Sequence, residues 1–325
     1  MTDAQPDLTI SLFGADSLFS QVGALVREIA GVKQGEDIEY VHRMRVASRR
    51  LRTRLQIFAP WLPAKKVESW QKQIRRITTA LGKARDTDVQ LDFVRQFREQ
   101  LTDPRQRPGI DRLILRLAQR RTRAQTRVIK ALEKVEGNHA LEELAQTLRQ
   151  LRVLRHLQHV EPRSAELYRL ACQSISAQLA NMLSYEPYIH HPESATELHA
   201  MRIATKHLRY VMELFTALYP GALKPYLQAA RAMQDLLGDI HDSDVWQMEL
   251  AQFHQQELVR AQHYLGHSRG VHRLRAGIEA LLDDRRAFRE KRYQAFVSLW
   301  ERHEHELLWQ ELQKTIQPPV AESEE

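Results

Sequence analysis

One block of sequence occurs twice in this chain of 325 residues, and this repetition constrains the fold more than any other feature. Residues 42–58 read HRMRVASRRLRTRLQIF, and residues 199–215 read HAMRIATKHLRYVMELF. Farther along each copy, residues 81–89 (LGKARDTDV) match residues 237–245 (LGDIHDSDV). Two matched blocks in the same order, at nearly the same separation, predict an internal duplication.

The repeated unit is expected to be helical. Leu, Ala, Gln, Arg and Glu dominate the sequence and favour helices, whereas Gly and Pro number only twelve each. Apolar residues recur at helical spacing, and no segment alternates steadily between apolar and polar residues. We therefore predict an all-α fold in which each copy is a four-helix bundle with a connecting helix. The first repeat spans residues 10–158, the second spans 159–316, and an acidic, proline-containing tail at 317–325 is expected to be disordered.

Glycines and prolines interrupt the helical pattern and set the expected helix ends. Gly82 and Gly238 are each predicted to end a helix, and the next helix is predicted to begin at the Asp-x-Asp sequence that follows. The expected helices span residues 18–29, 36–58, 65–82, 87–101, 110–135, 141–157, 165–184, 194–218, 223–238, 243–260 and 272–313.

Charge and composition narrow the possible partners and the compartment. The net charge of +7 and a pI near 9.5 favour an anionic partner without identifying it. No apolar run approaches the ~20 residues that span a bilayer, and the start MTDAQPDLTI does not resemble a signal peptide. The single cysteine, Cys172, cannot form an internal disulfide. We expect a cytoplasmic protein without a membrane partner.

The repeated block places its positive charges on one side of a helix. At 100° per residue, the basic residues of each copy fall on one face and the apolar residues fall on the opposite face. That basic face holds no Asp or Glu, although like charges at i,i+4 destabilise a helix and ordinary exposed faces mix signs. A solvated amphipathic face is the alternative interpretation. The basic sets are His42, Arg45, Arg49 and Arg52 in the first copy, and His199, Arg202, Lys206 and Arg209 in the second; the apolar sets are Met44, Ala47, Leu51, Leu55 and Phe58, and Met201, Ala204, Leu208, Met212 and Phe215.

Further basic stripes occur on other helices of the first copy. Lys72, Arg76, Thr79 and Lys83 fall within about 60° of one another on the next helix. The helix after that carries a longer stripe, and the last helix of the second copy has arginines on its apolar side, which are expected to point inward. These two sets are Arg112, Arg116, Arg120, Arg123, Arg127 and Lys130, and Arg285, Arg289 and Arg292.

The third helix of the second copy is less basic. Asp235 and Asp239 replace basic positions of the first copy, and His241 stands where the first copy has Arg85. We therefore expect the first copy to bind an anion more strongly than the second.

Arginine stripes suit a chain of phosphates. Guanidinium groups form bidentate, charge-assisted hydrogen bonds to phosphate oxygens, and lysine adds a mobile charge. A stripe that advances ~5–6 Å at each i,i+3 or i,i+4 step can follow a linear polyanion. His42 and His199 lie in line with the arginines, where each could donate to phosphate or stay neutral and bond to a carbonyl.

An Asp-x-Asp sequence recurs in each copy, as Asp86/Asp88 and Asp242/Asp244. We interpret these residues as helix caps, with Thr87 in a capping box, that also orient neighbouring arginines. The alternative is a Mg²⁺ site for phosphate chemistry, although no further cluster of carboxylates accompanies it.

Motifs for other activities are absent from the sequence. The chain has no Walker loop, GxGxxG, HExxH or GxSxG, and its fifteen histidines are scattered, so no metal site or cofactor is predicted. It also lacks a helix-turn-helix pattern and stacking aromatics among its arginines, so sequence-specific nucleic-acid binding is not expected.

The paired motifs resemble those of the CHAD family (conserved histidine α-helical domain). The pattern HxxRxxxxxLR occurs at residues 42–52 and 199–209, and LGxxRDxDV occurs at 81–89, so the resemblance covers roughly residues 10–316. It implies two pseudo-symmetric four-helix bundles related by a pseudo-twofold axis, with basic helices facing a central groove or pore. It also implies binding of inorganic polyphosphate and association with polyphosphate granules.

The resemblance, together with the stripes, gives a set of candidate ligands for polyphosphate. We expect non-catalytic binding in the cytoplasm, with granules and other phosphate-rich anions as further partners. A metal-dependent polyphosphate or phosphate-ester hydrolase that uses the Asp-x-Asp sequences, and a nucleic-acid scaffold, are the alternatives. Whether the two halves share one groove stays open. The candidates are His42, Arg45, Arg49, Arg52, His199, Arg202, Lys206 and Arg209 from the motif, Lys72, Arg76, Lys83 and Arg116 from the stripes and the likeness, and Arg285 and Arg289 from the last long helix.

Overall fold

The computed structural model describes residues 7–157 and 163–318, and every regular element in these two ranges is helical. The predicted all-α fold is therefore confirmed. The predicted boundary between the repeats, at residues 158 and 159, lies outside the described residues, as do residues 319–325 of the acidic tail.

Two aspartates and a glycine mark ends of the first helices. The Asp7 carboxylate accepts a hydrogen bond from the Thr9 amide at 2.7 Å, and the Asp37 carboxylate accepts one from the Glu39 amide at 2.8 Å. Each pairs a backbone N–H that the helix itself leaves free. Gly35 ends the second helix at a φ of 73°, a left-handed conformation that suits glycine. The elements of this half are α1 (Leu8–Arg27), α2 (Ile29–Gln34), α3 (Ile38–Phe58), the 3₁₀ turn η1 (Ala59–Trp61), α4 (Ala64–Gln100), α5 (Arg107–Gly137) and α6 (Ala140–Leu157).

The second half runs through its helices in a similar order. Its α8 has 21 residues, as does α3, and carries the second copy of the repeated block. The Ser164 hydroxyl caps the first helix of this half by accepting a hydrogen bond from the Leu167 amide at 3.2 Å. The elements are α7 (Ala165–Leu183), η2 (Glu186–Tyr188), α8 (Ala195–Phe215), η3 (Thr216–Leu218), α9 (Lys224–Leu265), η4 (Val271–Leu274), α10 (Arg275–His305) and α11 (Leu308–Thr315).

Two of the predicted helix breaks are wrong. α4 and α9 run unbroken through Gly82 and Gly238, so the Asp-x-Asp sequences lie inside helices and cap nothing. The predicted capping box at Thr87 is also wrong, because its hydroxyl donates to the Lys83 carbonyl one turn earlier, at 2.8 Å. A Cβ on Gly82 would lie 3.9 Å from Arg45 Nε, so this glycine lets the guanidinium lie close to the α4 backbone.

Other helix ends also differ from the predictions. α1 begins ten residues earlier than expected, at Leu8, where Asp7 supplies the cap. The final predicted helix is divided into η4, α10 and α11, and Leu307 takes a positive φ of 52° between the last two helices.

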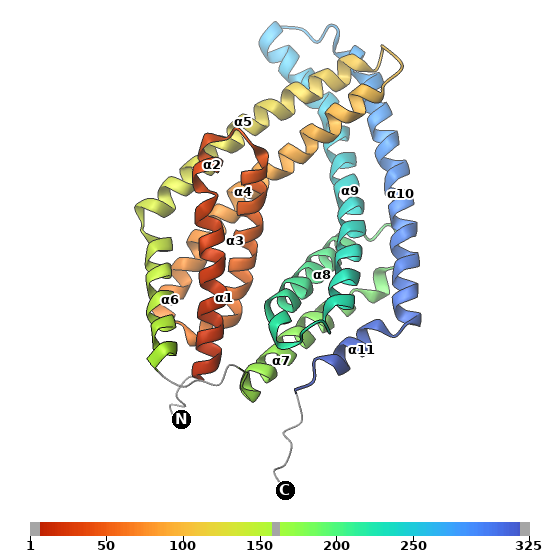
Figure 1. Ribbon diagram of the computed structural model, residues 1–325. Helices are drawn as coiled ribbons and strands as arrows, with labels where there is room; N and C mark the ends of the chain where they lie inside the picture. The colour runs from red at the N-terminus through yellow and green to blue at the C-terminus, as the bar shows by residue number, and fades with distance from the viewer. Residues whose placement is uncertain (1–6, 158–162, 319–325) are drawn as a thin grey trace.

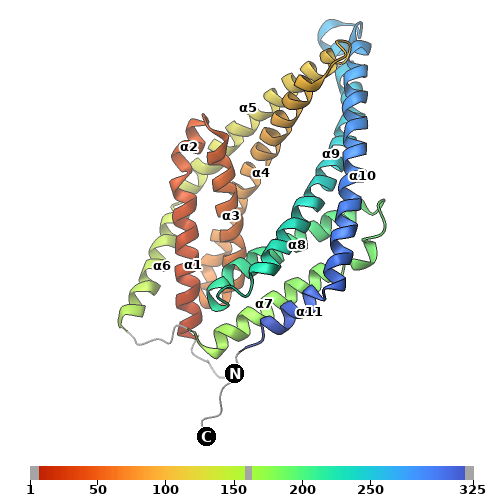
Figure 2. The same ribbon diagram turned by 45° about the vertical axis from the view of Figure 1, so that its right-hand side comes forward.

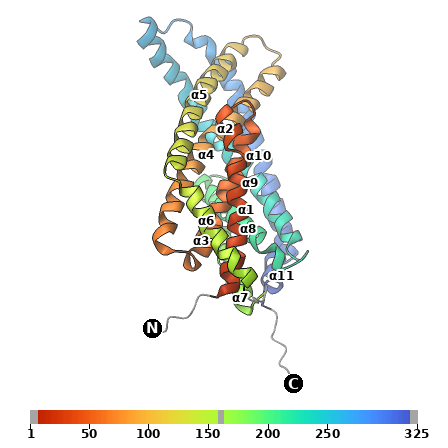
Figure 3. The same ribbon diagram turned by 60° about the vertical axis from the view of Figure 1, so that its left-hand side comes forward.

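The stretch Leu8–Gln34 is, by length and composition alone, apolar enough to cross a membrane. The prediction that no apolar run approaches that length therefore needs correction. About half of the most apolar part of this stretch is buried in the structure. α1 packs against α3 and α6 (Figure 3), and Leu18 and Leu25 are fully buried there, so its apolar residues supply core contacts.

The apolar faces of the repeated blocks form the core, as predicted. Met44, Leu51 and Leu55 in α3 have no exposed surface, and Met201, Leu208 and Met212 in α8 have none either. Phe13 of α1 stacks on Phe215 of α8 with ring centroids 5.9 Å apart, which joins the cores of the two halves. A salt bridge of 2.9 Å from Arg50 to Glu213 links α3 directly to α8. These faces are buried, so the basic faces must point away from the two cores.

The two halves also meet at the far ends of their long helices. The α4–α5 and α9–α10 pairs lie side by side there, at the top of Figure 1, and the halves diverge from this apex in Figure 2. A second apolar core fills the apex, and the Gly109 and Gly277 backbones approach so closely that a Cβ on Gly109 would lie 2.1 Å from the Leu274 carbonyl oxygen. This second core consists of Leu91, Val94, Ile110, Leu113, Leu117, Trp246, Leu250, Phe253, Ile278 and Leu281.

Candidate anion-binding site

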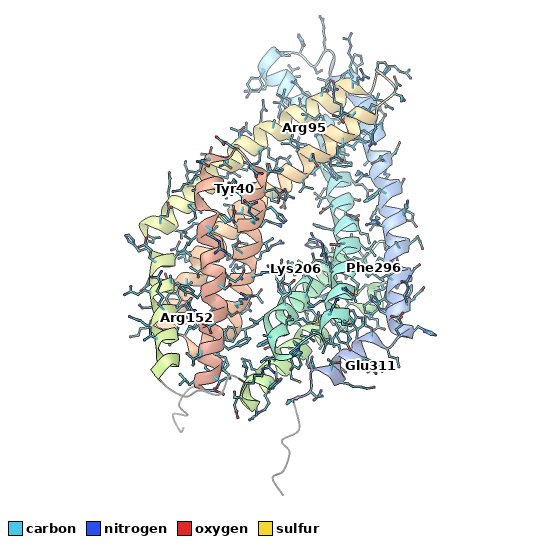
Figure 4. All side chains as sticks on the ribbon, viewed as in Figure 1. Tyr40, Arg95, Arg152, Lys206, Phe296 and Glu311 are labelled. Carbon is cyan, nitrogen blue, oxygen red and sulfur yellow. The ribbon has the colours of Figure 1, made fainter. Side chains whose placement is uncertain are left out.

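A cavity of about 330 Å³ lies between α3 and α4 of the first half and α8 of the second. Both halves therefore line one shared space, the question that the sequence left open. Figure 4 shows Lys206 on the side of α8 that faces the first half. The lining residues are Arg45, Arg49, Arg52, Thr53 and Gln56 from α3, Thr78, Thr79, Gly82, Lys83 and Asp86 from α4, and Lys206, His207 and Tyr210 from α8.

Helical periodicity explains why the basic residues reach this cavity. On α3, the buried residues Leu51 and Leu55 fix one face in the core, so Arg45, Arg49 and Arg52 lie on the other face. On α8, the corresponding burial of Leu208 turns Lys206 toward α3. The two basic faces that the sequence predicted separately therefore meet.

The positive charge in the cavity is not balanced by carboxylates. Within the described part of the chain, Arg49, Arg52, Lys83 and Lys206 form no salt bridge. Arg45 pairs with Asp86 at 3.2 Å, but the Asp86 side chain is 66% exposed, so solvent weakens this pair. The cavity is consequently an electropositive space with room for an anion.

Lys206 shows the effect of this charge most clearly. Burial of its amine, together with the charges of Arg49, Arg202, Arg45 and Arg52, lowers its pKa to about 7. Both causes act in the same direction, because each disfavours the charged ammonium form. An anion in the cavity would reverse the electrostatic part of this effect.

Arg45 lines the cavity, and Arg202 stands at the matching position of the second copy, on α8, without lining it. The Nε of each is buried without a hydrogen-bond partner among the described residues. Burial, followed by the charge of Arg49, lowers the pKa of Arg45. Burial raises the pKa of Asp242, and the charge of Arg202 opposes this rise. Buried donors without partners are uncommon in native proteins and mark a place where a ligand or water completes the bonding.

The two motif histidines do not line the cavity. The Nδ1 atoms of His42 and His199 are buried without hydrogen-bond partners, so the carbonyl bond considered above does not form at this nitrogen. His199 stacks on His241 with ring centroids 3.7 Å apart. Burial lowers the pKa of His42 and His199, and it lowers the pKa of His241 to about 4. These rings are therefore neutral at pH 7.

Several other predicted ligands lie beside the cavity without lining it. Lys72 is exposed on α4, and Arg76 donates to the Gln73 side chain at 2.6 Å. Arg209 is bound to Glu213 and Gln234, each at 3.0 Å, so carboxylate and amide oxygens already occupy its guanidinium.

Three predicted ligands are held elsewhere by carboxylates, which corrects their assignment. Arg116 binds Glu257 at 2.7 Å near the apex. Arg285 binds Asp284 and lies over the Phe93 ring at 4.1 Å, and Arg289 binds Asp244 at 2.5 Å. Arg285 and Arg289 are mostly buried, as their inward orientation predicted, but they serve packing between helices.

The first part of the α5 stripe is a contact between helices. Arg112 and Arg116 bind Glu257 on α9, and Arg120 binds Glu249 on the same helix at 3.0 Å. These three arginines link the two halves. Arg123, Arg127 and Lys130 are exposed, and no residue of the stripe lines the cavity.

The Asp-x-Asp residues orient arginines, as one part of their interpretation predicted. Asp88, whose side chain is 4% exposed, accepts a hydrogen bond of 2.5 Å from Arg121 on α5. Asp244 stands in the same relation to Arg289 on α10. Among the residues that the structure describes, no three His, Cys, Asp or Glu side chains are grouped to hold a metal ion.

Sequence reasoning missed several polar residues of the site. Thr53 and Tyr210 occupy matching positions of the two blocks and both line the cavity, so the repeat itself could have identified them. Thr79 lies on the predicted stripe with Lys83, and both line the cavity. Thr78 has no such signal, because its place in the lining depends on how α4 crosses α3. Outside the cavity, Arg121 lies in an arginine-rich run of α5 beyond the predicted stripe, and only its contact with Asp88 distinguishes it.

The fold is similar to solved structures. The CHAD domain from the plant Ricinus communis matches with a TM-score of 0.63 and 24% sequence identity, covering 86% of this chain and 91% of that one. PptA from Streptomyces chartreusis matches with a TM-score of 0.62 and 18% identity, covering 90% of this chain and 99% of that one. Among curated proteins, no significant match was found. The family model described as the CHAD domain matches residues 17–251, which is most of the sequence. The chain therefore belongs to the CHAD family.

Proposed function

We propose that this protein binds inorganic polyphosphate in the shared cavity without catalysing a reaction on it. The observation that carries the proposal is the convergence of Arg45, Arg49, Arg52 and Lys206 from two halves of the chain on one space with a single exposed carboxylate. The family to which the chain belongs is linked to polyphosphate binding, which supports the same ligand.

The chemistry of the cavity favours a chain of phosphates over other anions. Guanidinium groups form paired hydrogen bonds with phosphate oxygens, and the Thr79 hydroxyl can donate to a further oxygen, whereas Thr53 and Thr78 donate to the carbonyls of Arg49 and Ile74. Tyr210 supplies the lining with one aromatic ring, whereas single-stranded nucleic acids need several stacking platforms. A narrow cavity also excludes the width of a DNA duplex, so duplex DNA should displace polyphosphate poorly.

Three of the four Asp-x-Asp carboxylates support binding over hydrolysis, because arginines already hold them. Asp88 and Asp244 are each bound to an arginine at 2.5 Å, and Asp86 is bound to Arg45. A Mg²⁺ ion would have to replace these guanidinium contacts to gain ligands. Phosphate release from polyphosphate with added Mg²⁺, lost on Asp86→Asn, would instead establish the hydrolase alternative.

Removal of two cavity arginines tests the proposed site. Arg49→Ala with Arg52→Ala should weaken polyphosphate binding by 10-fold or more, because each arginine loses charge-assisted hydrogen bonds. The slope of log affinity against log salt should become shallower by roughly 1 to 2, since fewer counterions are released. Calorimetry with polyphosphate of defined length, at several salt concentrations, measures both quantities.

A matched pair on α5 provides the control. Arg123→Ala with Arg127→Ala removes the same charge from exposed positions that do not line the cavity. If this control weakened binding as much as the cavity pair did, the affinity would come from net charge and the cavity assignment would be wrong.

The proposal extends to the cell. A cytoplasmic protein that binds long polyphosphate without degrading it would collect on polyphosphate granules. A fluorescent fusion should colocalise with the granules, and the Arg49→Ala/Arg52→Ala variant should stay diffuse.

A further inference from the structure

Lys206 is surrounded by positive charge contributed by both halves of the chain. Its amine lines the cavity from α8, and the charges that act on it come from Arg45, Arg49 and Arg52 on α3 and from Arg202 on its own helix. The Lys206 side chain is half-buried, and the arginines that act on it from α3 line the same cavity. Its protonation is therefore tied to what else occupies the cavity.

The groups that face the cavity from the other elements do not supply Lys206 with a counterion. From α4 come Lys83 and Asp86, and the Asp86 carboxylate is paired with Arg45. From α9, Asp242 is buried beside Arg202, and its charge acts on that arginine and on Arg45. On α8 itself, His207 lines the exposed rim of the cavity. Within the described residues, no carboxylate forms a salt bridge with the lysine.

Resting on the proposed function, we propose that Lys206 couples polyphosphate binding to the uptake of one proton. A phosphate oxygen that enters the cavity balances the surrounding guanidinium charge and accepts a hydrogen bond from the ammonium group. To form that ammonium group, the neutral amine accepts a proton through its lone pair: the new N–H bond forms as the bond between that proton and a water or buffer acid breaks, and the conjugate base stays in solution. The proton stays with the complex until the anion leaves.

The direction of the pH dependence follows from the free and bound states of this amine. In the free protein the pKa of Lys206 is about 7, because of burial and the neighbouring arginines. A bound anion raises that pKa. The affinity for the anion therefore rises as the pH falls from the pKa of Lys206 in the complex to its pKa in the free protein, and it levels off below pH 7. Between pH 7 and the bound pKa, affinity falls by up to about tenfold for each unit of pH.

Histidines of the repeated blocks are the other titratable groups to consider. Burial lowers the pKa of His207, His42 and His199 below the ordinary value of 6.5, and that of His241 is lowered further. All four rings are therefore neutral in the free protein at pH 8. A bound anion would favour protonation of these rings as well, so the Lys206 variants below identify the share of the proton uptake that belongs to the lysine.

Calorimetry of the full chain measures the proton directly. Polyphosphate of one defined length is titrated at pH 8 in buffers of equal ionic strength that differ in ionisation enthalpy. The slope of the observed binding enthalpy against the buffer ionisation enthalpy gives the number of protons taken up. The same ligand is used throughout, so protons exchanged by polyphosphate itself cancel between variants.

Two substitutions of Lys206 and one control sharpen the comparison. Lys206→Arg places a permanently charged group in the cavity, and Lys206→Met places a neutral one there; both should lower the proton count by close to one. Lys130→Arg makes the same chemical change at an exposed lysine of α5 that does not line the cavity, and it should keep the wild-type count. Thermal melts confirm that each variant is folded.

Each possible outcome bears on the proposal. A lower proton count in both Lys206 variants, with a flatter affinity profile between pH 8 and pH 9 in Lys206→Arg, supports it. Equal proton counts in wild type and both variants, with binding retained, would overturn it while leaving the proposed function intact. Absence of binding by the wild-type chain would refute the proposed function itself, and this inference with it.

Discussion

At the scale of single residues, the structure holds carboxylates inside long helices with arginines from the next helix. Asp88 on α4 is almost fully buried, and Arg121 on α5 donates to one of its oxygens at 2.5 Å, while the other oxygen has no partner in the described chain. Burial raises the pKa of Asp88, and the hydrogen bond and charge of Arg121 oppose this rise. Replacing both residues of such a buried pair by apolar residues changes the stability of the protein little. Removing only one partner lowers the stability strongly, because the other charge stays buried without its partner.

We predict that Arg121→Met lowers the free energy of unfolding by about 3 kcal/mol at pH 8, because it leaves a buried carboxylate without its counter-charge. The variant raises the pKa of Asp88 further above its unfolded value. A carboxyl group whose pKa is higher in the folded than in the unfolded state makes the protein less stable as the pH rises between these two pKa values. The loss of unfolding free energy in Arg121→Met should therefore be smaller at pH 5 than at pH 8. Urea denaturation at both pH values measures this difference.

The control for this prediction is Arg123→Met, on the exposed side of the same helix. It should change stability by no more than about 0.5 kcal/mol. A deficit that did not depend on pH would mean that Arg121 acts through packing and not through Asp88.

Residues within one helix were the predictable part of the site. Arg45, Arg49 and Arg52 share a face by periodicity alone, and the structure brings that face to the cavity. Arg116 obeyed the same periodicity, yet it binds Glu257, 141 positions away in sequence. Periodicity gives the face of a helix but not the partner opposite that face, so pairs between helices could not be predicted.

At the scale of elements, the glycines of α4 and α9 show how a local signal can mislead. Glycine costs about 1 kcal/mol in a helix interior, which favours a break. A helix of 37 residues such as α4 has buried residues on both sides of Gly82, and their packing outweighs that local cost. Gly238 in α9 lies under Arg202 as Gly82 lies under Arg45. Because the helices continue, the Asp-x-Asp residues pair with arginines and do not cap.

We predict that Gly82→Ala stabilises the protein by about 0.5 to 1 kcal/mol, because it restores helix propensity. The added Cβ would lie 3.9 Å from Arg45 Nε, which is an ordinary contact. Thermal or urea denaturation measures the change.

The same substitution at Gly109 should have the opposite sign. There the Cβ would lie 2.1 Å from the Leu274 carbonyl oxygen, so α5 and α10 must separate, at a cost of about 1 to 3 kcal/mol. Destabilisation by Gly82→Ala would show that the close approach of Arg45 to the helix matters more than propensity.

At the scale of the whole molecule, two contact regions position the halves on either side of the cavity. One lies between α1, α3 and α8, where Phe13 meets Phe215 and Arg50 meets Glu213. The other is the apex, where the carboxylate of Glu257, 1% exposed, is bound by arginines of α5. The repeat predicted two similar bundles, but nothing in one repeat specifies how it meets the other. The shared cavity could therefore not be predicted from the sequence and became visible only in the structure.

We predict that Glu257→Gln lowers the free energy of unfolding by about 3 kcal/mol at pH 7, because it leaves three arginines, Arg112, Arg116 and Arg260, without their common carboxylate. Although burial acts to raise it, the pKa of Glu257 is lowered overall by hydrogen bonds from Arg116 and Arg260. Its contribution is therefore present above the unfolded value of 4.5 and is lost as the pH falls, so wild type and variant should converge below about pH 4.

Glu249→Gln is the matched control, since Glu249 binds Arg120 at a partly exposed site. It should cost less than about 1 kcal/mol. Chemical denaturation across pH 3 to 8 compares the two variants, and an equal loss in both would contradict the role given to burial at the apex.

Because α4 is one unbroken helix, a tilt of this helix at the apex also moves the part of it that lines the cavity. Val94 in the apex core and Lys83 at the cavity wall lie 11 residues apart on one rigid helix, a separation of about 16 Å. A tilt of only about 4° at the apex therefore moves the α4 side of the cavity by roughly 1 Å, which is enough to weaken a hydrogen bond to a phosphate oxygen. The apolar and glycine contacts of the apex thus help to set the spacing between the two basic faces, although none of these residues lines the cavity.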